Sequence, residues 1–573
     1  MNLFAFILLL IFTSAAISDV TYCPTVKLSG RKINFTDTEL QLICGDPKSH
    51  AWKYIPPYEA QYILKGFLQS RGYLSPEFKV EDKILHVKRG RRSKVKNVVV
   101  VAGNVNLEKK IKKDVKRLYL RRELSTSMLN SLEAESTGQL RRRGYPCSKV
   151  ESEVDVTSDS VTVIVKPDEK YKFGTIKQEK IPGLHENALA RFYPMEEDQR
   201  FNGDLLTLTE KRILRAEVLQ GTYFLEKCEN KSFSLEQRFI VGPARAFRFG
   251  AGASTEVGPM ARARWSHNRY GNMASLLSAS LEASLRVQSL NLTSDYFPWT
   301  DRPRQSLFTQ VNVIRESQFK YEQFLTRVRP QMKWTKDIHN HGTTLIFGPA
   351  YENGTFHSQD KSDTRTFSTA VLEGSFQRMG HDYELFDVHP QDGNEESVSL
   401  SYRNPMLGFG QSLTKLDTSA VRLARLGNNG RGAIIGGIRM KAGTSFVKST
   451  TDLSALPPEV KFFGGGSDDL RGYLLRTLPR NDGAGALTRF IAKGEIRKTH
   501  FFHEKMESFT FVDGGYFGEK SFSLESRLWF SPGLGLRFLS PIGQVQAYWA
   551  RALATSPSKD YGNFFFAGIG GIF

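Results

Sequence analysis

Two hydrophobic patterns divide the chain near residue 244. Before that point, apolar residues recur at helical spacing, as in Leu107, Ile111 and Val115, and short alternating runs such as Val161–Val165 stand between them. After Arg245, segments of about ten residues alternate apolar and polar positions, and clusters of Gly, Asn, Asp, Ser and Pro separate them. The patterns predict small α/β units followed by a long series of strands.

Three copies of one local pattern stand in the first part. A helical stripe ends at Gly72, Gly144 and Gly221, which lie 72 and 77 residues apart, and a short strand follows each glycine. The implied order in each unit is strand, helix, helix, strand, strand. We expect each glycine to take the left-handed conformation that ends a helix. The predicted units are 19–92, 93–168 and 169–243.

The second part, residues 244–573, has the alternation of a membrane barrel. In Leu277–Gln288 every second residue is apolar and the others are polar, and Thr488–Arg497 repeats the pattern. A transmembrane barrel points the apolar face at lipid and the polar face at its lumen. At ~10 residues per strand and a similar length per connection, this part holds ~16 strands. The aromatic segment Phe564–Phe573 is typical of a closing strand.

The N-terminus predicts export. The apolar run Leu3–Ala16 and the small residues of Ala16-Ile17-Ser18 indicate a signal peptide over residues 1–18. No Lys or Arg precedes the run, so a buried helix or a membrane anchor is the alternative. No later stretch reaches 18 consecutive apolar residues, and a membrane-spanning part must therefore consist of strands.

Four cysteines of an exported chain permit three disulfide pairings. The arrangement that joins near neighbours is Cys23 with Cys44 and Cys147 with Cys228, and free thiols are the alternative. Tyr22 precedes Cys23 where a lipoprotein signal has a small residue, which argues against a lipid anchor.

The formal charge of +19 is concentrated in one segment, because Lys83–Arg122 holds 15 Lys or Arg and only Glu108 and Asp114 as acids. The apolar stripe of the predicted helix places its basic residues on the solvated face. This face either binds an acidic protein partner or anionic lipid, or is merely solvated. Nucleic acid is disfavoured, because no recognition motif accompanies the charge. The basic residues are Lys109, Lys110, Lys112, Lys113, Lys116 and Arg117.

Catalytic and cofactor motifs are weak. His339 and His341 have a spacing that can bind metal on a strand, but Asn340 and Gly342 indicate a turn, and no third ligand is evident. The glycines Gly464–Gly466 lack the Lys-Ser/Thr ending of a phosphate loop. We therefore predict neither an enzyme nor a bound metal or cofactor.

Three ordered motifs near the C-terminus carry a family resemblance. Phe463–Tyr473, with the sequence FGGGSDDLRGY, resembles the luminal-loop motif of outer-membrane assembly barrels with POTRA domains. Phe511–Gly515 and Gly535–Gly543 resemble the two strand motifs that follow it in that family. Gln544 stands where the family usually has proline, which concerns only the local turn.

Three POTRA-like units and the ending Phe565–Gly570 are similar to the TamA branch, the translocation and assembly module. The resemblance implies an outer-membrane factor that helps insert or secrete β-barrel and autotransporter clients. It further implies periplasmic N-terminal domains, contact with outer-membrane lipid and a TamB-like periplasmic partner anchored in the inner membrane. A two-partner-secretion-type or passive pore, a general barrel assembly factor and an outer-membrane hydrolase are the alternatives.

The motif match predicts a lock inside the barrel. Arg471 must avoid lipid, and the alternation of Phe490–Arg497 puts Glu495 on the luminal face, while the resemblance places Asp513 on an adjoining strand. Both carboxylates are then within reach of the Arg471 guanidinium. The alternative is an exposed loop in which Arg471 pairs with Asp468 or Asp469. The predicted lock consists of Arg471, Gly472, Tyr473, Glu495 and Asp513.

Glycines at both ends of the predicted barrel indicate a weak seam between its first and last strands. Opening of this seam toward the membrane is one interpretation, and tight packing or barrel curvature is the other. The seam residues are Gly250, Gly252, Gly568, Gly570 and Phe573.

Overall fold

The computed structural model forms two compact units, Met1–Lys170 and Tyr171–Phe573, which are described separately. The predicted signal peptide at residues 1–18 lies outside the described residues, as does Phe573. Described are residues 19–30, 32–46, 48, 55–229, 232–319, 321–358, 364–386, 390–404, 412–429, 432–447, 453, 456–480, 484–540, 543–554 and 562–570.

The first small domain has a four-stranded sheet in the order β1-β2-β4-β3, one strand more than the pattern predicted. Its helix α3 buries Leu64 and Leu68, four residues apart, against this sheet. A disulfide joins Cys23 to Cys44, and the pairing of Cys147 with Cys228 stays a prediction. The elements are β1 Asp19–Cys23, β2 Val26–Ser29, α2 Asp37–Cys44, α3 Pro57–Ser70, β3 Glu77–Glu81 and β4 Ile84–Lys88.

The second small domain has the predicted order of strand, helix, helix, strand, strand. Its sheet runs β5-β7-β6, with β5 parallel to β7, and the apolar stripe Leu107, Ile111 and Val115 is buried in the core. Gly144 follows the second helix with a φ of 89°, and Gly72 in the first domain has a φ of 86°. The elements are β5 Asn97–Val101, α4 Val105–Tyr119, α5 Thr126–Arg142, β6 Lys149–Asp155 and β7 Ser160–Lys166.

The third small domain departs from the repeat. Gly221 does not end a helix: it is the first residue of β9, and Glu217 takes the left-handed conformation after α6 with a φ of 56°. The prediction for this glycine was wrong because five residues, 216–220, separate the end of α6 from the start of β9. The elements are β8 Lys177–Gln178, η1 Glu186–Phe192, α6 Gly203–Arg215, β9 Gly221–Glu229 and β10 Ser232–Ile240.

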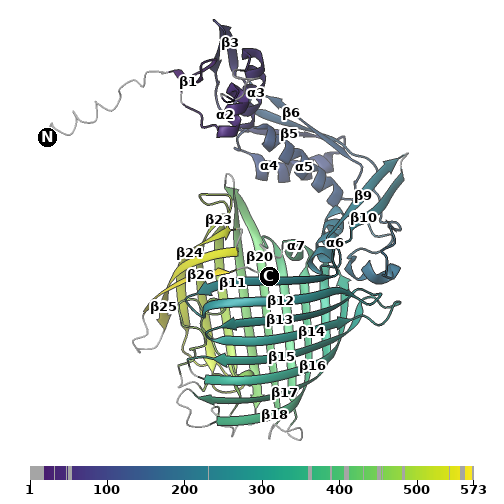
Figure 1. Cartoon of the computed structure of the whole chain (residues 1–573), viewed down its shortest axis with the longest axis vertical. Coiled ribbons are helices and arrows are strands. Elements are labelled where there is room, and N and C mark those ends of the chain that lie inside the picture. Colours follow the sequence, from purple (N-terminus) through teal and green to yellow (C-terminus); the bar gives the residue numbers. More distant parts are fainter. Residues whose placement is uncertain are drawn as a thin grey trace, which may run out of the picture. The chain divides into compact units, whose positions relative to one another are not determined.

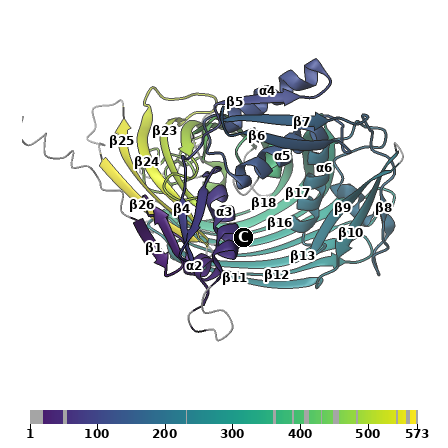
Figure 2. The same ribbon diagram turned by 90° about the horizontal axis from the view of Figure 1, so that it is seen from above.

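Sixteen strands form a closed antiparallel barrel in chain order, which confirms the predicted fold class (Figure 1). Figure 2 shows the strands from a direction turned by 90°. They are β11 Arg245–Ser254, β12 Gly258–Tyr270, β13 Ser275–Ser284, β14 Val287–Tyr296, β15 Gln305–Ser317, β16 Tyr321–Ile338, β17 His341–Ser358, β18 Thr364–Gly380, β19 Gly393–Arg403, β20 Leu413–Asn429, β21 Gly432–Val447, β22 Thr488–Lys498, β23 Met506–Gly518, β24 Trp529–Ser540, β25 Gly543–Ala554 and β26 Gly562–Gly570.

One predicted strand is two. The run Leu277–Gln288 breaks after Ser284, and β14 begins at Val287. The alternation of apolar and polar residues continues through the turn: Leu285 still points outward, with 71% of its surface exposed. Ser284 Oγ accepts a hydrogen bond from the Val287 N–H at 3.0 Å and so closes the turn. None of the helices in the described residues is long and apolar enough to cross a membrane.

Among the described residues, two short helices stand out between barrel strands. The helix α7, His381–Leu385, connects β18 to β19, and the 3-10 helix η4, Pro458–Val460, lies between β21 and β22. The third small domain contacts the turns on the side of α7, since the His185 N–H donates to the Asn272 carbonyl between β12 and β13 at 2.8 Å. We call this side the domain-side edge of the barrel.

Candidate functional site

The segment between β21 and β22 packs against the inner face of the barrel wall. We call its described residues, 453, 456–480 and 484–487, the luminal loop. Several of its apolar side chains are buried with wall residues of β22, β23, β24 and β25, and they form one hydrophobic cluster. The cluster includes Phe462, Leu470, Tyr473 and Leu478 of the loop and Ile491, Phe517 and Trp529 of the wall.

The structure brings Arg471, Glu495 and Asp513 together at the centre of this loop. Arg471 Nε and Nη2 each donate to an oxygen of Asp513 at 2.8 Å, and Nη1 donates to Glu495 Oε2 at 2.7 Å. The Arg471 backbone N–H donates to Asp513 Oδ2 at 3.1 Å. The guanidinium carbon also lies 3.6 Å from the centroid of the Phe511 ring. A planar guanidinium suits this paired geometry better than an ammonium would.

The strand register places both carboxylates on the luminal face. Lys493 in β22 is the partner of Asp513 in β23, so Glu495 follows two residues away on the same face. Arg471 is 4% exposed and Asp513 is fully buried. Buried charges are tolerated when they are paired and hydrogen-bonded, and Arg537 Nη1 supplies a further donor to Glu495 Oε1 at 3.0 Å.

Gly472 and Tyr473 fit the loop onto the wall. Gly472 has a φ of 102°, and a Cβ there would lie 3.0 Å from the Ser531 Cβ and 3.3 Å from the Ala550 Cβ. The Tyr473 hydroxyl donates to the Phe530 carbonyl at 3.1 Å and accepts from the Leu553 N–H at 3.1 Å. A glycine is therefore required for close approach, and the tyrosine reaches the backbone of two strands.

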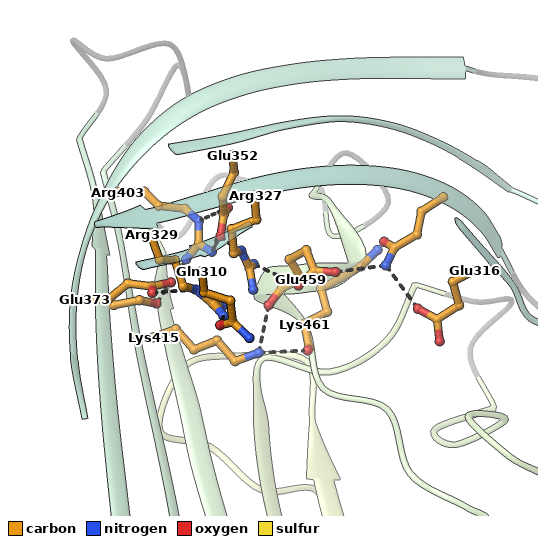
Figure 3. A network of polar contacts seen from close by, with 12 residues as sticks. Gln310, Glu316, Arg327, Arg329, Glu352, Glu373, Arg403, Lys415, Glu459 and Lys461 are labelled. Carbon is orange, nitrogen blue, oxygen red and sulfur yellow. Dashed lines mark hydrogen bonds and ion pairs between the residues drawn. The ribbon is translucent and has the colours of Figure 1, made fainter. Parts of the chain in front are cut away.

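A second anchor of the luminal loop was not predicted from the sequence. Figure 3 shows Glu459 among charged residues of the wall. Its carboxylate accepts from Gln323 Nε2 at 2.8 Å and from Arg327 Nη2 at 3.1 Å. Its backbone carbonyl accepts from Lys415 Nζ at 2.8 Å. The loop is thus held by β16 and β20 as well as by β22 and β23.

Further ion pairs extend this second anchor along the wall. Arg327 also pairs with Glu352 of β17, which is fully buried, and Arg403 Nη2 of β19 donates to both Glu352 oxygens at 3.0 Å. The signal was present in the sequence as charges on the polar faces of alternating segments. The partners of these charges could not be predicted from the sequence, because they depend on which strands are neighbours and on the register between them.

The seam between β11 and β26 is short. Only three residue pairs join these strands in the described residues, whereas β11 and β12 have ten. Gly252 pairs with Gly570, and Gly568 pairs with Ser254. Gly250 pairs with Arg262 of β12 and has no partner in β26 among the described residues.

The third domain is fastened to the domain-side edge by a cluster of charges. Arg212 of α6 donates to both oxygens of Asp337 and to both oxygens of Glu384, at 2.7–3.0 Å. His381 Nε2 lies 2.9 Å from Asp337 Oδ1. Arg212 and its two carboxylates are each at most 12% exposed, so α6 and α7 meet through a largely buried network.

The basic residues of α4 lie on its solvated face. Lys109, Lys110, Lys112, Lys113 and Lys116 are exposed, and the Arg117 side chain lies outside the described residues. The cations are not compensated locally, since the helix carries only Glu108 and Asp114 as acids. The strands β5 and β6 form the two edges of the same domain's sheet. This domain therefore combines a basic surface with sheet edges.

The described histidines and carboxylates form no metal centre. His339 lies in the turn between β16 and β17 with a φ of 47°, and His341 Nδ1 lies 2.7 Å from the His339 carbonyl oxygen. Within the described residues, no group of three or more His, Cys, Asp or Glu side chains is arranged to hold a metal ion.

Comparisons with known proteins show which family and which solved structures this chain resembles. The Omp85 superfamily domain matches residues 277–573. BamA from Haemophilus ducreyi lacking POTRA domains 1-3 is 13% identical, with a TM-score of 0.50 over 84% of this chain and 100% of that chain. CdiB from Acinetobacter baumannii is also 13% identical, with a TM-score of 0.47 over 84% of this chain and 90% of that chain. The family match spans more than half of the sequence, and the chain therefore belongs to the Omp85 superfamily.

Proposed function

We propose that this chain is an outer-membrane translocation and assembly factor that helps insert or secrete β-barrel and autotransporter clients. The observation that carries the proposal is the seam, in which three residue pairs join β11 to the described part of β26, beside a luminal loop that is fastened to the wall. A client strand needs unpaired backbone groups to bind, and a short seam supplies them at low cost. The mechanism uses backbone pairing and needs no cofactor.

We also assign roles to the small domains and to the luminal loop, and the first of these roles again uses backbone pairing of strands. Sheet edges of the small domains can bind an extended client segment by adding it as a strand. Arg212 holds the third domain at the domain-side edge of the barrel, through Asp337 at the end of β16 and Glu384 of α7. The luminal loop stabilises the wall at β22–β25, and β25 is the neighbour of β26.

The finer assignment is to the TamA branch. It is supported by the three small domains, by the motif around Arg471 and by the aromatic C-terminal segment. The basic face of α4 is the proposed contact for an acidic surface of a TamB-like periplasmic partner. We place the three small domains in the periplasm and the barrel in the bacterial outer membrane.

Liposome reconstitution tests this function. The purified full chain should accelerate insertion of an unfolded barrel client into liposomes relative to protein-free vesicles, measured as protease-protected, heat-modifiable client. The same vesicles should show no steady ion conductance, because the luminal loop fills part of the pore. Steady conductance without accelerated insertion would instead identify a passive pore and overturn the proposal.

A further inference from the structure

Arg422 of β20 points to the outside of the barrel. Its chain neighbours Val421 and Leu423 line the luminal cavity, whereas Arg422 is exposed on the opposite face of the strand. Within the described part of the chain, no hydrogen bond or ion pair joins the Arg422 side chain to another residue. An ionised group on the lipid-facing surface is costly unless it finds a partner, so it marks a functional position.

Two other outward arginines have carboxylate partners. Arg315 of β15 lies 2.9 Å from Glu322, and Arg378 of β18 lies 3.9 Å from Glu396. Both pairs are formed across adjacent strands on the outer face. Arg422 differs from them because the protein supplies it with no such anion among the described residues.

Glu396 is the carboxylate nearest to Arg422 in register, and it is already engaged. Asn394 of β19 stands directly opposite Arg422, and Glu396 stands opposite Ala420. Asn394 Nδ2 donates to Glu396 Oε1 at 3.1 Å, in addition to the pair with Arg378. The outer surface at β18–β20 therefore keeps one positive charge in excess, which favours an anionic ligand.

An apolar hollow of about 570 Å³ adjoins Arg422. Its floor contains Gly436 and Gly494, which have no side chains, and its rim is formed by exposed apolar residues. An ideal Cβ at Gly494 would meet only the Val512 carbonyl oxygen, at 3.8 Å, so the space above it is open. We call this region the outer hollow; its rim residues are Leu426, Ile438, Ile496 and Val512.

The hollow extends from Arg422 across β21 and β22 to β23. The row of paired residues that contains Arg422 continues to Ile438, Gly494 and Val512. In the other direction it ends at Asn394, the second residue of β19, at the domain-side edge. Barrel strands are tilted, so such a row climbs through the bilayer. Arg422 lies at the β20 end of this row, and Leu426 lies four residues closer to the domain-side end of β20.

We propose that the outer hollow binds one anionic phospholipid. Its phosphate lies against the Arg422 guanidinium, and an acyl chain lies over Gly436 and Gly494. Arginine binds phosphate through two parallel hydrogen bonds, and the apolar rim suits a hydrocarbon chain. An apolar protein segment in the same place would leave the Arg422 charge without a partner. This inference does not depend on the proposed function.

Native mass spectrometry of the full chain in detergent tests the site with two probes, phosphatidylglycerol and phosphatidylcholine. We expect one molecule of phosphatidylglycerol to be retained about five-fold more tightly, as one arginine near a membrane surface provides. Arg422→Gln should remove this preference. Gly494→Leu should weaken retention of both lipids, because its side chain fills the hollow. Arg315→Gln removes a paired outward arginine and should change neither result.

Two outcomes would overturn the proposal. One is an unchanged preference for phosphatidylglycerol in Arg422→Gln, provided that heat modifiability shows a folded barrel. The other is displacement of the bound lipid by an amphipathic strand peptide derived from a barrel client, which would identify a protein as the occupant. Because retention of lipid is measured without any client assay, failure of this site leaves the proposed assembly function untouched.

Discussion

Arg471 is held by three kinds of contact: paired hydrogen bonds to Asp513, an ion pair with Glu495 and the face of the Phe511 ring. Removal of any one partner leaves a buried charge that the others cannot fully stabilise. The loop position is therefore set by a network, and its members are expected to act together rather than as independent contributions.

We expect Arg471→Ala and Asp513→Ala each to destabilise the barrel by about 3–5 kcal/mol, because each leaves a buried charge unpaired. The double variant should lose less than the sum, since both changes break one network. The measurement is the urea midpoint of the heat-modifiable gel shift.

Arg262→Gln is the matched control, because the Arg262–Glu282 pair is 42% and 34% exposed and should contribute at most about 1 kcal/mol. Arg471→Lys keeps the charge and tests whether the planar geometry matters. Strictly additive losses, or a normal midpoint for Arg471→Ala, would show that the loop is not held in this way.

A pH prediction concerns Asp155 in the second small domain. Hydrogen bonds from the Ser158 and Thr157 hydroxyls and from the Thr157 N–H lower its pKa from 3.8 to about 2. The folded pKa is depressed, so its stabilising contribution is present above pH 3.8 and is lost as the pH falls through about 2. Carbon NMR of labelled aspartate should show this pKa.

Replacing both hydroxyls, in Thr157→Ala with Ser158→Ala, should return the pKa of Asp155 toward 3.8. A labelled aspartate remote from this turn provides the reference titration in the same sample. If Asp155 already titrates near 3.8 in the unmodified chain, the hydrogen bonds do not stabilise its charged form.

At the scale of elements, α4 combines a buried stripe with an exposed basic face. Charge on such a face changes association rates more than it changes stability. We expect reversal of three of its residues to Glu to slow association with the soluble periplasmic part of a TamB-like partner by about ten-fold or more at low salt. The residues are Lys109, Lys112 and Lys116.

The rate difference should fade at high salt, where the screening length falls to about 3 Å. A reversal of equal charge in the first domain, at Lys65, Lys79 and Lys83, is the control, and circular dichroism verifies that α4 remains folded. Equal slowing by both triple variants would mean that only net charge matters. Unchanged association rates would mean that the basic face of α4 is only solvated and does not steer a partner.

Local patterns predicted elements better than contacts between them. The stripe of Leu107, Ile111 and Val115 was enough to orient α4, and alternation was enough to place Glu495 in the lumen. Glu459 was missed, because its partners Gln323 and Arg327 lie more than 130 residues away in sequence and meet it only through the fold of the loop. The end of β13 was missed because its turn keeps the strand periodicity.

At the scale of the whole molecule, the seam is where closure of the barrel is weakest. Ser254 and Gly568 are opposite each other, and an ideal Cβ at Gly568 would lie 3.3 Å from the Ser254 Cβ. This separation is close to the ~3.5–4.5 Å of a disulfide. We expect Ser254→Cys with Gly568→Cys to form a cross-link that leaves the barrel folded and abolishes client insertion until it is reduced.

Gln546→Cys with Gly568→Cys is the matched control, since these residues pair between β25 and β26 and their cross-link leaves the seam free. Insertion of client into liposomes is measured before and after reduction for both variants. Full activity in a verified Ser254–Gly568 cross-link would exclude lateral opening.

The two anchors of the luminal loop have a mechanical consequence. Glu459 is held by β16 and Arg471 by β23, and these strands are seven positions apart in a ring of sixteen. Because the luminal loop is bonded to nearly opposite sides of the barrel wall, it resists changes in the shape of the barrel's cross-section. While the contacts of Glu459 and Arg471 are intact, we expect the barrel wall not to widen evenly. Any opening would then proceed by separation of β26 from β11, with the backbone hydrogen bonds between them breaking one after another.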